Sequence, residues 1–107
     1  MQISHLDHLV LTVRDIPKSL DFYSRVLGMQ PVVFGQGRHA LSFGQQKINL
    51  HQAGAEFEPK ATHPLPGSAD LCFIVNDRLD DVIEHLQALG VSILEGPVMR
   101  TGARGPI

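Results

Sequence analysis

The sequence predicts an α+β fold made of two related units, each of which opens with a strand followed by a helix. Three observations predict this fold class: an internal repeat, short apolar runs typical of strands, and two helical patterns with matching start and stop residues. Sliding the chain against itself places His8–Asp15 over Asp70–Asp77. Identical residues then fall at Leu9 and Leu71, Val13 and Val75, Asp15 and Asp77, Leu27 and Leu89, and Gly28 and Gly90.

The first unit, residues 3–51, begins with a strand rich in Val, Leu and Thr over residues 6–13. Asp15 is suited to cap the helix that follows, and Pro17 is tolerated in a first helical turn. Gly28 is expected to end this helix. The apolar face of the helix is predicted to be Ile16, Leu20, Tyr23 and Leu27.

Three further strands are predicted in the first unit, and they complete a β-α-β-β-β order. They cover Gln30–Phe34, His39–Phe43 and Lys47–His51, separated by turns rich in Gly and Gln. Residues 52–68, which contain three prolines, are predicted to be a linker.

The second unit, residues 69–107, repeats the strand and the helix, with Asp77 as the predicted cap and Gly90 as the stop. A strand over Val91–Leu94 is predicted after the helix. By comparison with the first unit, this second unit is incomplete, and we expect its exposed edges to make it the less stable part.

Composition excludes several classes of protein. The 107 residues include 11 acidic and 9 basic side chains, and a net charge of -2 argues against a nucleic-acid-binding face. No apolar run reaches the ~18 residues of a membrane span, and the N-terminus lacks the features of a secretory signal. The single cysteine, Cys72, cannot form a disulfide within the chain, so we expect a cytoplasmic protein. Cys72 itself is predicted to be a small apolar filler.

Three phrases resemble the vicinal oxygen chelate superfamily, which includes glyoxalase I, bleomycin-resistance and extradiol dioxygenase proteins. They are DHLVLTVRDIPKSLDFYSRVLGM (7–29), ALSFGQQKINLHQAG (40–54) and GSADLCFIV (67–75), and the last two resemble the lactoylglutathione-lyase-like subgroup. The resemblance covers essentially the whole chain. It implies one glyoxalase-like domain with a curled mixed sheet, the helices on the outer face of that sheet, and assembly as a homodimer.

Strand alternation identifies candidate site residues. His8, Asn49, His51 and Asp70 are expected to face away from the helices, into the curl of the sheet. The resemblance implies a divalent metal, Zn, Ni, Mn or Fe, held by His8, His51 and Asp70. For the second of these three ligands, the register of the family that the chain resembles favours Asn49. The chemistry of metal binding favours His51, because an imidazole is a better ligand than an amide. Each of these residues also fits a purely structural role as a hydrogen-bonded strand residue.

Two functions of different classes follow from the resemblance. The first is a metal-dependent enzyme, of lyase, isomerase or dioxygenase type, that acts on a small oxygen-chelating substrate. Such enzymes carry a glutamate ligand after a DPDGN-type turn on the final strand, and these 107 residues contain no such phrase. We therefore expect them to have little glyoxalase activity, and we assign no catalytic residue. The alternative is a non-catalytic module of bleomycin-resistance type that binds a small molecule.

Overall fold

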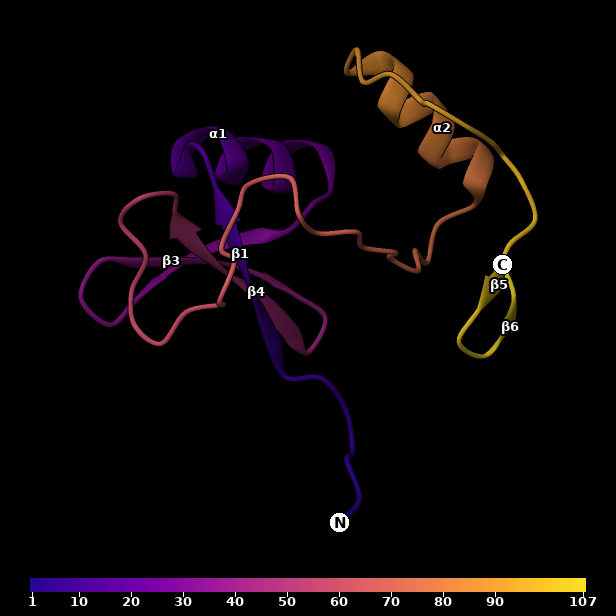
Figure 1. Ribbon diagram of the computed structural model, residues 1–107. Helices are drawn as coiled ribbons and strands as arrows, with labels where there is room; N and C mark the ends of the chain where they lie inside the picture. The colour runs from indigo at the N-terminus through magenta and orange to yellow at the C-terminus, as the bar shows by residue number, and fades with distance from the viewer. The chain divides into compact units, whose positions relative to one another are not determined.

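The computed structural model describes residues 1–107, which form two compact units, Met1–Leu71 and Cys72–Ile107. Figure 1 traces the first unit from indigo to orange and the second from orange to yellow. Both helices and strands are present, and the predicted α+β class is confirmed.

A four-stranded mixed sheet forms the centre of the first unit. Its strands are β1 (His8–Val13), β2 (Gln30–Phe34), β3 (Arg38–Phe43) and β4 (Gln46–Gln52). They lie in the order β1-β4-β3-β2 (Figure 1). β1 pairs with β4 in parallel, and the other two pairs are antiparallel. The predicted β-α-β-β-β order is therefore confirmed, with strand bounds within one residue of those predicted for β2, β3 and β4.

The helix between β1 and β2 has two parts, α1 (Ile16–Asp21) and a turn of π-helix, η1 (Phe22–Val26). Asp15 caps α1 as predicted, because its carboxylate accepts a hydrogen bond of 3.0 Å from the Lys18 backbone N–H. Gly28 ends the helical segment with a φ of 71°, a conformation that glycine adopts without strain. The π-helical turn was not predicted from the apolar spacing.

The core of the first unit lies between the sheet and the helix. Leu41, Ile48 and Leu50 are its largest fully buried side chains. The predicted helix-facing residues of β1 also contribute, since Val13 is buried and Leu9 and Leu11 pack against the cluster. From the helix, the core receives Ile16, Leu20 and Tyr23. Apolar side chains on one face of the sheet therefore hold the helix in place, and the opposite face remains for other contacts.

The second unit contains α2 (Leu79–Ala88) and a short hairpin of β5 (Thr101–Gly102) and β6 (Gly105–Pro106). Gly90 follows the helix with a φ of 71°, as predicted for its stop. The predicted cap was wrong: the N-cap is Arg78 rather than Asp77, and its side chain makes no capping bond. Asp80 and Asp81 instead bring negative charge to the first turn, where it interacts favourably with the helix dipole.

Two strands predicted in the second half do not form. Residues 70–76 and Val91–Leu94 are extended or irregular and belong to no β-ladder. The reason is that an apolar run becomes a strand only when a neighbouring segment satisfies its backbone groups. Cys72 is likewise exposed rather than a packed filler. No helix of the structure has both the length and the apolar character needed to cross a membrane.

Candidate functional site

The face of the sheet opposite the helix carries most of the candidate residues. In the parallel ladder His8 pairs with Lys47, Val10 with Asn49, and Thr12 with His51, so these six side chains share that face. In the antiparallel ladder Ala40 pairs with Asn49 and Ser42 with Lys47, which extends the same face across β3. We call this surface of β1, β4, β3 and β2 the polar face. The predicted facing of His8, Asn49 and His51 is confirmed.

Asn49 and His51 place buried polar atoms on the polar face. His51 is only 6% exposed. The Asn49 Oδ1 and the His51 Nδ1 are both buried, and neither has a hydrogen-bond partner within the protein. A buried polar atom without a partner destabilises a fold by about 1–3 kcal/mol, so proteins keep few of them outside functional sites.

His8 lies at the start of β1 and is more exposed. Its Nδ1 lies 2.8 Å from the Asp7 Oδ2, and this hydrogen bond lowers the pKa of the Asp7 carboxyl below its ordinary value. When the Nδ1–H of the neutral imidazole donates this hydrogen bond to the Asp7 carboxylate, the Nε2 atom has its lone pair available. His8 and His51 lie four residues apart along the ladder, about 13 Å, so the structure does not bring them together.

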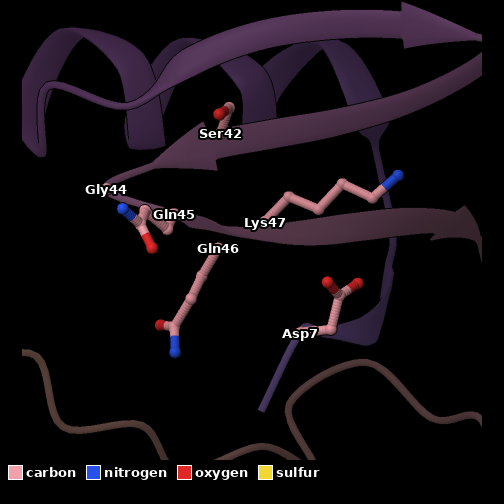
Figure 2. A pocket seen from close by; sticks show the side chains of 6 residues that line it. All are labelled: Asp7, Ser42, Gly44, Gln45, Gln46 and Lys47. Atoms are coloured by element: carbon pink, nitrogen blue, oxygen red, sulfur yellow. The ribbon is translucent and has the colours of Figure 1, made fainter. Parts of the chain in front are cut away.

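A pocket of about 260 Å³ opens beside His8, at the turn between β3 and β4 (Figure 2). It is lined by Asp7, Ser42, Gly44, Gln45, Gln46 and Lys47. Gln46 Nε2 donates a hydrogen bond of 3.1 Å to the Leu6 carbonyl, which ties the segment before β1 to this turn. Figure 2 shows Lys47 extended along β4, with its ammonium group directed away from Gln45 and Gln46.

Two cations and two aromatic rings lie over the rest of the polar face. The Lys47 Nζ lies 4.0 Å from the centre of the Phe34 ring. The Arg38 guanidinium lies 4.4 Å from the centre of the Phe57 ring, and the same ring packs edge-on against His51 at 6.0 Å. Cations over aromatic faces are attracted by the ring electrons. Phe57, which follows β4, therefore links Arg38 to the buried imidazole.

Sequence reasoning did not select Arg38 and Phe57 as site residues. A signal for Arg38 existed, because the alternation in RHALSF puts it on the same face as Ala40 and Ser42. No comparable signal existed for Phe57, since it lies in the predicted linker, where neither spacing nor strand register assigns a direction to a side chain.

The structure does not bring the predicted metal ligands together. Asp70, the third predicted ligand, is exposed and lies outside any strand. Nowhere in the chain do three or more His, Cys, Asp or Glu side chains come together in a way that could hold a metal ion. At the aligned middle position Asn49 offers a neutral amide, a weak ligand for transition metals. The role of His8, His51 and Asp70 as metal ligands therefore stays a prediction.

Comparison with known proteins identifies relatives over the full length of the chain. It is 60% identical over 107 residues to a glyoxalase domain-containing protein of Mycosarcoma maydis, and 58% identical to a virulence protein of Salmonella typhimurium. All of this chain is covered in both cases, with 60% of the first relative and 74% of the second. The chain thus spans about three fifths of the length of the M. maydis protein.

A solved structure confirms the fold. An integron cassette protein from the mobile metagenome of V. cholerae has 63% sequence identity and a TM-score of 0.97 over 99% of this chain and 83% of its own. The sequence profile of the glyoxalase/bleomycin resistance protein/dioxygenase superfamily matches residues 5–105. With nearly the whole chain matched, the protein belongs to the glyoxalase/bleomycin resistance protein/dioxygenase superfamily.

Proposed function

We propose that this chain binds a small organic molecule on the polar face of its sheet without needing a metal ion. The observation that carries the proposal is the pair of buried, unpartnered atoms, Asn49 Oδ1 and His51 Nδ1. A ligand that hydrogen-bonds to both atoms would remove the energetic penalty of burying them, and this gain would add to its affinity. Val10, which is exposed, provides apolar contact on the same face.

Binding of small uncharged and anionic organic molecules to chelator-treated protein, measured by calorimetry, tests this proposal. Asn49→Ala and His51→Ala should each weaken binding by about tenfold, because each removes one hydrogen bond to the ligand. His39→Ala is the matched control, because His39 pairs with Leu50 and so faces the helix side of the sheet. If another ligand is the natural one, a small-molecule screen read out by NMR should still place its hits on β3 and β4. Hits confined to the helix side of the sheet would refute the proposal.

The second candidate function is the metal-dependent enzyme, and one observation favours it. Histidines that bind metals almost always donate their other ring N–H to a carboxylate, as the 2.8 Å contact between His8 and Asp7 would allow. Metal content per chain, measured after purification without chelator, separates the candidates. Stoichiometric metal that is lost in His8→Ala but kept in His5→Ala favours the enzyme, as does turnover of the methylglyoxal–glutathione adduct. Absence of both favours the binding module.

We also propose that the chain acts as a single domain and pairs with a second copy. Exposed apolar side chains in the second unit support the pairing: Ile74 is 74% exposed, Met99 75% and Leu94 98%. Sedimentation velocity should show a dimer, and replacing these three residues with Ser should shift it towards monomer. A wild-type chain that stays monomeric at high concentration would contradict the proposal. A single cysteine, exposed at Cys72, supports a reducing, cytoplasmic location.

A further inference from the structure

The four strands of the sheet have an unusual charge composition. The whole chain has more acidic than basic residues, 11 against 9. The strands HLVLTV, QPVVF, RHALSF and QKINLHQ nevertheless contain no Asp or Glu. They carry Arg38, Lys47 and three histidines. The sheet is therefore a cationic surface within an acidic protein.

Lys47 and Arg38 lack acidic partners. Both side chains are half-buried, and none of the ion pairs in the structure includes either of them. Their charged groups lie over the rings of Phe34 and Phe57, at 4.0 Å for Lys47 and 4.4 Å for Arg38. A ring positions a cation and stabilises it partly, but it leaves the positive charge in place. Two half-buried cations on one face are thus without a direct ion pair.

The side chain of Lys47 brings its charge towards Arg38, although the register places Lys47 opposite Ser42, four residues along β3 from Arg38. Phe34 and Arg38 are direct partners in the β2–β3 ladder. Because the Lys47 ammonium lies over Phe34, it reaches across the face towards the row that contains Arg38. Phe57 then connects Arg38 to His51. The two cations therefore share the polar face with Asn49 and His51, and Arg38 contacts the same ring as His51.

The nearest carboxylates are engaged elsewhere. Asp7 accepts its hydrogen bond from His8, at 2.8 Å. Glu56, which precedes Phe57, accepts a hydrogen bond of 3.1 Å from the Gly54 backbone N–H. The hydrogen bond from His8 lowers the pKa of the Asp7 carboxyl, and the nearby charge of Lys47 lowers it further. Hydrogen bonds from the backbone N–H groups of Glu56 itself and of Gly54 lower the pKa of the Glu56 carboxyl. Both groups are therefore charged at neutral pH, and neither forms an ion pair with Lys47 or Arg38.

We infer that the polar face binds a small organic anion, with Lys47 and Arg38 holding its carboxylate, phosphonate or phosphate group and Asn49 and His51 contacting its uncharged part. The guanidinium offers a planar fork of donors and the ammonium offers three rotatable ones, a combination that suits an oxyanion. This inference rests on the proposed function, and it names the class of ligand for that site.

The test uses the full chain, treated with chelator, and three probes of one shape: benzoate, phenylphosphonate and the uncharged benzamide. Each is titrated into ¹⁵N-labelled protein and followed by NMR. Either or both anions should cause saturable shifts at Arg38, Lys47, Asn49 and His51, and benzamide should bind at least about tenfold more weakly. The difference between benzoate and phenylphosphonate shows whether a carboxylate or a phosphorus oxyanion is preferred.

Variants identify the cations responsible. Lys47→Met and Arg38→Met should each weaken anion binding by about tenfold, because each keeps its apolar stem and loses one charged donor. Lys18→Met, on α1, is the matched control and should bind as the parent does; the spectra themselves report whether each variant is folded. Benzamide binding as tightly as benzoate would overturn the inference while leaving the proposed function intact. Unchanged anion affinity in Lys47→Met and Arg38→Met would also overturn the inference. If none of the three probes binds, the result counts against the inference and against the proposed function.

Discussion

Replacing the buried imidazole with leucine, His51→Leu, should make the protein more stable and weaken its ligand binding. The unpartnered Nδ1 atom of His51 destabilises the fold by about 1–3 kcal/mol, and leucine removes that atom while filling a similar volume. The substitution also loses the ring contact with Phe57, worth about 0.5–1.5 kcal/mol. The net expectation is a gain of about 1 kcal/mol in the free energy of unfolding.

Urea denaturation followed by circular dichroism measures this change. For a domain of this size, about 1 kcal/mol corresponds to a rise of about 4–8 °C in Tm, which a thermal scan resolves easily. His39→Leu is the control, because it makes the same chemical change on the other face of the sheet. Its free energy of unfolding should stay within about 0.5 kcal/mol of the parent, since neither ring nitrogen of His39 is buried without a partner.

A loss of stability in His51→Leu would refute the reasoning. A decrease of about 1 kcal/mol or more would mean that the Nδ1 atom already makes a favourable interaction in solution. His51 would then be a structural residue, and its burial would say nothing about a ligand. If stability rises while ligand affinity stays unchanged, the unpartnered Nδ1 destabilises the fold as expected, but His51 does not contact the ligand.

Three further outcomes are expected. Leu50→Ala should lower the free energy of unfolding by about 2–5 kcal/mol in urea titrations, because Leu50 is 1% exposed; a loss below about 1 kcal/mol would show a loosely packed core. His8→Ala should raise the pKa of Asp7 in NMR titrations, because the substitution removes the hydrogen bond that lowers this pKa. The stabilisation from that bond is complete above the pKa of Asp7 in the unfolded chain, and it is lost as the pH falls through the pKa of Asp7 in the folded protein. An unchanged Asp7 titration would contradict this. Backbone amides after Glu95 should exchange with solvent faster than those of β4, because an isolated two-stranded hairpin is only marginally stable. Full protection of these amides would contradict this expectation.

The first unit could be predicted from the sequence because its signals are local. Alternation assigns Ile48 and Leu50 to one face and Asn49 and His51 to the other, and the structure agrees at every one of these positions. The same holds for Asp15, whose capping bond depends only on residues within the next turn. Where neighbours in sequence decide the structure, reading the sequence is enough.

The second unit was harder to predict because its structure depends on distant partners. Ile74 and Val75 have the composition of a strand, yet strand formation requires backbone groups of another segment at the right distance. The pattern of β1 repeats in residues 70–77, which indicates an internal duplication. The repeat does not indicate whether another strand is present to pair with residues 70–77, as β4 pairs with β1. The contact of Phe57 with Arg38 and His51 has the same cause, since no sequence rule tells which surface a loop covers.

The charges on the polar face connect the two candidate functions. A divalent cation near His8 would be repelled by Lys47 and attracted by Asp7, so a metal site here would need further acidic ligands to offset the repulsion. The middle ligand position holds the neutral Asn49, and Asp70 is exposed and outside the sheet. An anionic ligand experiences the opposite field, because Lys47 and Arg38 attract it. On electrostatic grounds the same residues that weaken the case for a metal strengthen the case for an anion.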